Sequence, residues 1–571
     1  MDLDSELLRG VPLSLCLEGF GKHWKSSGKS VSTEYASRPT EYYDAFLSHD
    51  WATGRWLKLL TLLILFNARA AIIGTFATSV LLGVLRCAAI LPDSDALVVS
   101  GGYLAFILIL SFWQRLREIL RRPLIVFLDK LCIFQDDAVK KQKGIMGLAG
   151  FLKMSNKLII LWSPRYFSRL WCTYELVTFL KFHMETGRVK IMPVKMSVLL
   201  LIMNVVWQVM RVSQQMMLAA DNAVQLPLAV SLTILIFLFV LPIYNYYGLG
   251  LFGDIDQLPN QLSQFRMQEA QCRCCSVGHR NPDTGQVMVC DRALVYDTLG
   301  EWHRSSRVRH KEESEDKRDD RSEDPEEEHL NKFNRLVQNK LTKALLQSVG
   351  GDVLHLSDYV IFILGSNSPW VAPWINVVYQ GPSTQLEGFL YFSWIVKQIL
   401  DHTMIYMLNF YLMRISMFLW KAALPMMQVM RKPLLGLIMV LPLTALAVVG
   451  TFPWFISMAT LTDESAVPVI PFLIFLIVNA FLFRDFRQRG QSQGRSRRSR
   501  ESSREPGERA ERASRISRHS SHKEKEAEDR AHGIEPGLTM GPLEEEVEEG
   551  LDYWSPDTLD RPDSLKDFMS V

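Results

Sequence analysis

YFSRLWCTYEL, residues 166–176, is the stretch that decides the fold of this chain. It follows the apolar run Lys157–Trp162, which reads as a buried strand stopped by a Ser-Pro pair. It leads into a helix predicted over Trp171–His183. Far upstream, YDAFLSHD at residues 43–50 opens with another strand-like run, Tyr43–Ser48. We interpret both stretches as parts of one soluble α/β domain.

Two further strands and a helix complete this domain. Leu124–Leu128 is a continuous apolar run ending in Asp129, as expected of a strand buried on both faces of a parallel sheet. A helix is predicted over Gly147–Met154, and Val189–Val194 reads as the last strand. Strands alternating with helices at this spacing predict a flavodoxin-like α/β domain with a parallel sheet. The ligand site of such a domain lies at the carboxyl ends of its strands.

An apolar hairpin separates the first strand from the others. Ala70–Leu91 and Leu97–Trp113 are each long enough to cross about 30 Å of hydrocarbon. The loop between them, Pro92–Asp95, is acidic, whereas the second segment runs into Arg115, Arg117, Arg121 and Arg122. The positive-inside rule therefore places both flanks of this transmembrane hairpin in the cytosol.

More membrane segments follow the domain and predict an α-helical transmembrane bundle. Val224–Leu241, Leu434–Met458 and Val467–Phe483 read as spans, and Val198–Val209 is short for a full crossing. Thr403–Leu424 carries Arg414 and Lys421, so it is either a crossing or an interfacial or tilted helix, with Gly388–Leu400 as a short re-entrant partner. We expect roughly six to eight spans in a multi-pass protein with both termini cytosolic. Which membrane holds it is left open.

The remaining segments are soluble or membrane-associated. Leu330–Val349 has apolar residues at helical spacing, which predicts an amphipathic helix, and the Arg/Ser-rich and acidic C-terminus predicts a disordered tail. The Arg/Ser tract can bind RNA, anionic lipid or a kinase, or simply be solvated; no feature predicts a specific nucleic-acid partner. The predicted divisions are 1–40 (N-terminal segment), 41–69 and 114–196 (α/β domain), 70–113 (hairpin), 197–247 (membrane segments), 248–302 (Cys- and His-containing cytosolic region), 303–329 (charged linker), 330–350 (amphipathic helix), 351–483 (soluble piece and membrane segments) and 484–571 (tail).

The two opening stretches resemble the Toll/interleukin-1 receptor (TIR) domain family. Tyr43–Ser48 is similar to its first strand, and residues 166–176 match the Tyr-x-Ser-x-x-Trp-Cys-x-x-Glu-Leu run typical of plant-type TIR domains. Asp129 and Ser155 also fit the pattern. The resemblance spans Glu41–Lys195 without the hairpin, and it implies signalling through self-association and protein partners. Two regions depart from the family: Gly54–Asn67 with the hairpin replaces the first helix, and Lys130–Met146 has an atypical composition.

The resemblance also implies a catalytic candidate. In enzymatic TIR domains the glutamate matching Glu175 cleaves NAD⁺ at the nicotinamide–ribose bond, where a carboxylate stabilises oxocarbenium character. The alternative is a carboxylate that only favours a helix N-terminus. Residues expected to contact NAD⁺ are Phe46, Ser48, Trp162, Ser163 and Trp171, although Trp171 also reads as core. Residues that can meet phosphates are Lys130, Arg165 and Arg169.

A cysteine-rich stretch forms the second candidate site. The eight cysteines of the chain do not suggest a disulfide framework. A zinc ion can be held by ligands from the set Cys272, Cys274, Cys275, His279 and Cys290. Cys274 and Cys275 are adjacent, which makes binding of one metal by both difficult. Palmitoylation and unbound reduced thiols are the alternatives.

Two functions from different classes follow. One is a membrane protein whose TIR-like domain acts in signalling and assembly through protein–protein interaction. The other is an NAD⁺ glycohydrolase with Glu175 as its catalytic residue. A channel or transporter is a third reading, suggested by Arg414 and Lys421 but without the paired broken helices that transporters show.

Overall fold

The structure is a computed structural model, and the residues that it describes belong to the first of two units of the chain, Met1–Phe486. The predicted tail, 484–571, lies outside the described residues. The described ranges are 5–25, 36–183, 188–218, 225–280, 285, 287, 289–311, 325–341, 363–365, 367–382, 388–459 and 469–482.

The soluble domain is built on a six-stranded sheet with the order β2-β1-β4-β3-β5-β6. The four predicted strands run parallel: β3 (Ala45–His49), β4 (Ile125–Phe127), β5 (Leu158–Trp162) and β6 (Val189–Pro193). Two short strands extend this sheet antiparallel beyond β4: β1 (Arg9–Pro12) and β2 (Arg38–Pro39).

The sheet is therefore mixed, and the expectation of a wholly parallel sheet is wrong at this edge. Val11 of β1 pairs with Val126 of β4, so a strand from the N-terminal segment covers what would otherwise be an open edge. β1 has only four residues, two of them Gly10 and Pro12, and it carries no alternating apolar pattern. It is placed by backbone pairing, which sequence periodicity does not report.

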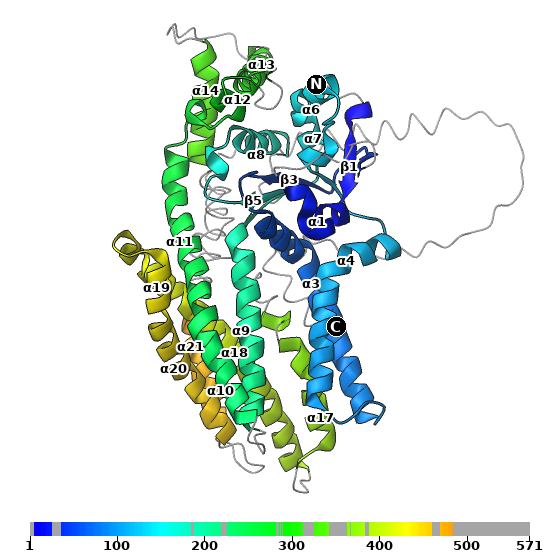
Figure 1. The fold of residues 1–571 in the computed structure, drawn as a ribbon, viewed down its shortest axis with the longest axis vertical. Helices are drawn as coiled ribbons and strands as arrows, with labels where there is room; N and C mark the ends of the chain where they lie inside the picture. Colours follow the sequence, from blue (N-terminus) through cyan, green and yellow to red (C-terminus); the bar gives the residue numbers. More distant parts are fainter. Residues whose placement is uncertain are drawn as a thin grey trace, which may run out of the picture. The chain divides into compact units, whose positions relative to one another are not determined.

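Helices cover both faces of the central strands (Figure 1). Successive residues of a strand point to opposite faces. On one face Phe46 stacks on Phe127, which in turn lies against Phe151 of α7 (Leu148–Lys153). α8 (Leu170–His183), which confirms the predicted helix, covers the same face. On the other face His49 contacts Trp24 of the 3-10 turn η2 (Lys22–Trp24), which follows α1 (Leu13–Gly21).

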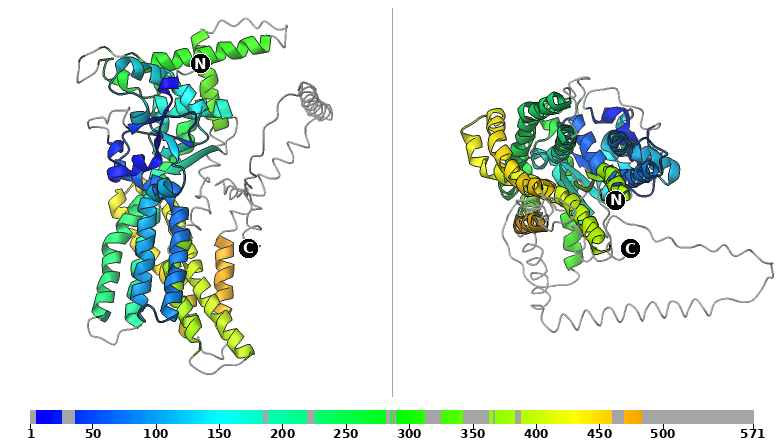
Figure 2. Two further views of the ribbon diagram at one scale, coloured as in Figure 1. Left: turned by 90° about the vertical axis from the view of Figure 1, so that its right-hand side faces the viewer. Right: turned by 90° about the horizontal axis from the view of Figure 1, so that it is seen from below.

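The predicted hairpin corresponds to α3 (Arg55–Cys87) and α4 (Asp95–Leu120), which lie side by side (Figures 1 and 2). α3 is longer than the predicted span because it begins soon after β3 and runs without a break into the apolar stretch. The atypical region after β4 forms two short helices, α5 (Asp129–Cys132) and α6 (Ala138–Met146).

Five helices among the described residues are long and apolar enough to cross a membrane. They are the helices of the hairpin and three more, Val194–Ser213, Val230–Ser263 and Lys432–Pro453. The first of these three belongs to α9 (Val194–Leu218), which is longer than the short segment predicted there. The second combines part of α10 (Gln225–Leu235), a π-helical turn (Ile236–Val240) and α11 (Leu241–Ser263). The third covers α19 (Lys432–Ile438) and most of α20 (Val440–Ala459).

The prediction that Gly388–Leu400 and Thr403–Leu424 form two separate pieces is wrong. They form a single helix, α18 (Phe389–Ala422), because no glycine or proline interrupts it. The segment before it contains α17 (Val371–Gln380) and the 3-10 turn Ser368–Trp370; the turn Leu424–Gln428 follows α18, and α21 (Val469–Leu482) ends the described chain.

The Cys- and His-containing region and the helices after it pack against the soluble domain. It contains α12 (Arg273–Ser276) and α13 (Asp291–Lys311), so the first residues of the expected disordered linker are helical instead. α14 (Pro325–Arg335) and the π turn Leu336–Leu341 confirm the described part of the amphipathic helix. Leu330, Phe333 and Val337 are buried in the same core cluster as the sheet.

Candidate functional site

The site forms where β3 and β5 end side by side. Leu47 to His49 pair in register with Ile159 to Leu161, so the residues that follow both strands meet at one edge. The chain passes from β3 to β4 on one side and then to β5 on the other, which makes this the switch point of the sheet. Open α/β sheets bind ligands at such a switch point, outside the carboxyl ends of the strands.

Glu175 reaches this edge from α8. The Ser48 hydroxyl, at the end of β3, donates a hydrogen bond to Glu175 Oε2 at 2.5 Å. Ser48 Oγ also lies 2.6 Å from the Tyr166 hydroxyl, which donates to the carbonyl of Cys172 at 3.1 Å. A strand, a turn and a helix therefore fix the carboxyl group. All four of these residues belong to the two stretches that the sequence singles out.

The environment of Glu175 changes its protonation. Burial, opposed by the Ser48 hydrogen bond and assisted by the negative charge of Asp129, raises the pKa of Glu175 to about 8. Near neutral pH the carboxyl group is thus mostly protonated. An oxocarbenium-like centre is stabilised by the ionised form, so chemistry that uses Glu175 in this way gains from higher pH or from a cationic ligand.

The opposite face of the same edge holds residues that sequence reasoning missed. The ammonium group of Lys58, fully buried in the first turns of α3, lies 5.0 Å from the Trp51 ring and 5.6 Å from the Trp24 ring. Trp51 donates its indole N–H to Asp129 Oδ2 at 2.9 Å. The only sequence signal was a lysine inside an apolar helical run, which does not distinguish a buried cation from a snorkelling one.

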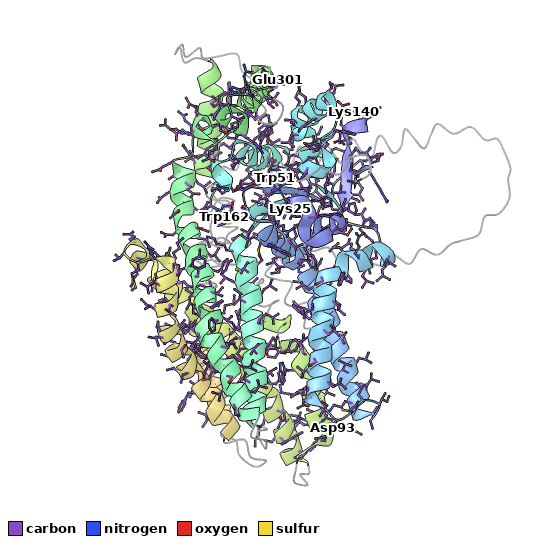
Figure 3. The ribbon with its side chains drawn as sticks, viewed as in Figure 1. Lys25, Trp51, Asp93, Lys140, Trp162 and Glu301 are labelled. Atoms are coloured by element: carbon purple, nitrogen blue, oxygen red, sulfur yellow. The ribbon has the colours of Figure 1, made fainter. Side chains whose placement is uncertain are left out.

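Three buried polar atoms at this edge have no hydrogen-bond partner among the described residues: His49 Nε2, Trp162 Nε1 and Ser163 Oγ. Burial lowers the pKa of His49 well below its usual range, and the positive charge of Lys58 adds to this effect, so its ring is neutral. Buried polar groups normally have partners, so three unpartnered atoms call for a ligand or ordered water. Figure 3 labels Trp51 and Trp162 beside the strands of the sheet.

The other predicted contacts lie elsewhere. Phe46 is 1% exposed and stacks on Phe127 at 4.5 Å, so the structure places it in the core rather than at a rim. Trp171 donates its indole N–H to Asp291 Oδ2 at 3.2 Å. Arg165 and Arg169 lie 3.3 Å and 3.8 Å from the buried carboxylate of Asp50.

Lys130 also has a partner, since its ammonium donates to the carbonyl of Lys25 at 2.7 Å. Cys172 is buried in the core, and burial raises the pKa of its thiol, as expected of an unreactive filler. The three predicted phosphate-binding cations are thus all engaged within the protein.

The cysteine-rich stretch is brought together by the fold. One ligand atom from each of Cys274, Cys275, His279 and Cys290 lies within 4.8 Å of the others. Cys272 lies instead with Cys274 and Asp291 in a second, overlapping group. The residues of these two groups come from α12, the start of α13 and the chain beside these helices.

Comparison with known sequences agrees with this description of the soluble domain. A sequence model of the TIR domain family matches residues 114–204, so the chain carries a TIR domain. The matched range includes β4, β5, β6 and the helix bearing Glu175, whereas β3 lies upstream of it and completes the centre of the sheet. No curated protein and no solved structure matches the chain.

Proposed function

We propose that this chain is a multi-pass membrane protein whose cytosolic TIR domain acts in signalling and assembly through protein–protein interaction. One observation carries the proposal: α3 belongs to two hydrophobic cores. Leu62 is buried in the core of the sheet domain, whereas Ala71 is buried among the apolar helices, and Leu65 packs against both. A movement of the membrane helices is therefore passed to the sheet through one unbroken helix.

A second connection leaves the same edge of the sheet. β6 ends at Pro193 and α9 begins at Val194 with no loop between them. Lys195, in the first turn of α9, pairs with Asp254 of α11 at 2.5 Å. The carboxyl edge of the sheet is thus held by two helices that enter the apolar bundle.

The charge distribution supports the orientation. Four arginines follow the second hairpin segment, whereas the connecting turn has only Arg86 beside it, paired with Asp93 and Asp95. Because positive charge is retained on the cytosolic side, this distribution supports a cytosolic TIR domain and N-terminus.

Self-association is tested with the full-length protein in liposomes. Donor- and acceptor-labelled chains should show energy transfer that rises with protein density. Val139→Asp, at a 65% exposed position of α6, should reduce this transfer, whereas Phe20→Asp, at another exposed position, should not. A wild-type protein that stays monomeric at every density would contradict the proposal.

A second candidate, NAD⁺ glycohydrolase activity, is favoured by the arrangement of Glu175. The carboxyl group is oriented by Ser48 at the switch point, and three buried polar atoms at the same strand ends have no partner among the described residues. Loss of nicotinamide leaves positive charge on the ribose, which a nearby carboxylate stabilises. Water attack on that carbon then gives ADP-ribose, nicotinamide and a proton.

Nicotinamide release by the full-length protein in nanodiscs tests this activity. Glu175→Gln should abolish release while self-association persists, and Glu269→Gln, at an exposed position outside the sheet domain, should leave it unchanged. If release occurs, its rate should rise with pH through the pKa of Glu175, about 8. No release from clustered wild-type protein would reject the activity and leave the assembly proposal standing.

A further inference from the structure

The turn between α12 and α13 gathers four metal-binding side chains on a short piece of chain. Cys274 and Cys275 lie on the single turn of α12. Cys290 immediately precedes α13, and its carbonyl accepts the Leu294 N–H at 3.1 Å. His279 lies in the connection between them. We call Cys274, Cys275, His279 and Cys290 the cysteine cluster.

The sulfur positions agree with one tetrahedral centre. Zn–S bonds of about 2.3 Å in a tetrahedron place neighbouring sulfur atoms about 3.8 Å apart. Sγ of Cys275 lies 3.9 Å from Sγ of Cys274 and 3.8 Å from Sγ of Cys290. Both separations are far too long for a disulfide bond. The adjacency of Cys274 and Cys275, an objection at the level of sequence, is therefore compatible with a shared metal.

The position of His279 requires an unusual backbone. Gly278 and His279 both have positive φ angles, 63° and 56°, in the left-handed region that residues other than glycine seldom adopt. The turn is closed by the His279 N–H, which donates to the Cys274 carbonyl at 2.8 Å. His279 Nε2 is buried and has no hydrogen-bond partner among the described residues. A strained residue with an unpartnered buried nitrogen indicates a ligand.

A short backbone pairing returns the chain to the cluster. Arg280 and Val287 form an antiparallel bridge between His279 and Cys290. Cys272 Sγ lies only 3.0 Å from Cys274 Sγ, which is shorter than a tetrahedral edge. We therefore place Cys272 beside the cluster rather than among its ligands.

We propose that Cys274, Cys275, His279 and Cys290 bind one zinc ion. Three thiolates and an imidazole in a closed tetrahedron are the donor set of structural zinc sites. The Asp291 N–H donates to Cys274 Sγ at 3.2 Å, a contact that orients a metal-bound thiolate. The four protein ligands leave no coordination position for a substrate, so the ion has a structural role.

The zinc site would fix α12 and α13 against the TIR domain. Asp291 accepts the Trp171 indole N–H, and the backbone of Gln271 exchanges hydrogen bonds with Ser168 and Leu170. These contacts fall on the turn and first residues of the helix that carries Glu175. The metal would thereby stabilise residues 166–176 from outside the sheet. This inference does not depend on either proposed function.

Metal analysis of the full-length protein in detergent tests the proposal. Protein from zinc-supplemented cells should carry one zinc per chain, and replacement by Co²⁺ should give the thiolate charge-transfer and strong visible bands of a tetrahedral sulfur site. Cys275→Ser and Cys290→Ser should lose most of the zinc. The matched control Cys87→Ser, at a partly buried cysteine of α3, and Cys272→Ser should retain it.

Three results would overturn the assignment. If wild-type protein shows neither bound zinc nor a Co²⁺–thiolate spectrum, the zinc site does not exist. This measurement does not depend on the folding of any variant. Hydroxylamine-sensitive acylation of Cys275 or Cys290 would show a lipid-modified thiol instead. Loss of zinc in Cys272→Ser with retention in Cys290→Ser would refute this ligand set.

Discussion

Two groups of polar side chains in the soluble part of the molecule are held in different ways. The carboxyl-edge cluster, which comprises Ser48, His49, Trp162, Ser163 and Glu175, is positioned by strands and a helix whose apolar residues are buried. The cysteine cluster is positioned by a one-turn helix, a left-handed turn and a two-residue bridge. The first geometry follows from burial of apolar surface. The second lies at the border of the same core, where Cys274 is buried, and we expect the proposed zinc ion to fix its short turns.

Metal removal should have the largest effect, and it should act on the cysteine cluster but not on the carboxyl-edge cluster. A strong zinc chelator should leave the β3 and β5 amides protected from hydrogen exchange. Amides around Cys274 and His279 should lose protection by about 100-fold or more, since zinc contributes most of the folding free energy of such small sites. Hydrogen exchange read by mass spectrometry measures both regions in one sample. An equal loss of amide protection at β3 and β5 would show that the two clusters are not held in different ways.

The reverse experiment weakens the sheet. Phe127→Ala removes a fully buried ring that contacts Phe46 and Phe151, and such a change costs about 3–5 kcal/mol. Protection of the β3 and β5 amides should fall by about two to four orders of magnitude, at 1.4 kcal/mol per tenfold. Zinc content should remain unchanged. If zinc is lost as well, the cysteine cluster takes its geometry from the sheet core.

The difference between burial of apolar runs and contacts between distant residues also explains which parts of the fold the sequence could predict. The four parallel strands were predictable because continuous apolar runs at regular spacing specify strands buried on both faces. Glu175 was singled out by the resemblance of residues 166–176 to TIR domains, and its place fits a helix that begins at the carboxyl edge after β5.

What sequence did not predict depends on contacts between distant parts of the chain. β1 is held by backbone pairing with β4, and Lys58 is buried only because Trp24 and Trp51 close over it. Cys274 and Cys275 face one point because α12 turns between them and the chain reverses at His279. None of these arrangements has a periodic signal in the sequence.

A smaller effect concerns the ionisation of Glu175. Its pKa is raised from 4.5 to about 8, so between these values the folded protein holds a proton that the unfolded chain releases. The folded state is therefore penalised as pH rises, fully so above pH 8. Glu175→Gln removes this penalty, and its melting temperature relative to the wild type should rise by a few degrees from pH 5 to pH 9.

Thermal unfolding in detergent across that pH range measures the effect. Glu269→Gln, at an exposed carboxylate, serves as the control and should keep a constant difference from the wild type. If the difference in melting temperature between Glu175→Gln and the wild type does not change with pH, the Glu175 carboxyl group has a normal pKa. The carboxyl-edge cluster would then contain no buried, protonated acid.

The smallest effect tests whether the clusters communicate. Trp171→Phe keeps an aromatic ring against Tyr174 but removes the indole N–H that Asp291 accepts at 3.2 Å. A hydrogen bond to a charged group contributes about 1.5–3 kcal/mol, and partial exposure of this pair reduces that to about 1 kcal/mol. Hydrogen exchange at the start of α13 should increase about fivefold, with zinc retained and β3 unaffected. If exchange at α13 stays unchanged, Trp171 contributes only packing, and the zinc site supports the helix of Glu175 through the backbone bonds of Gln271 alone.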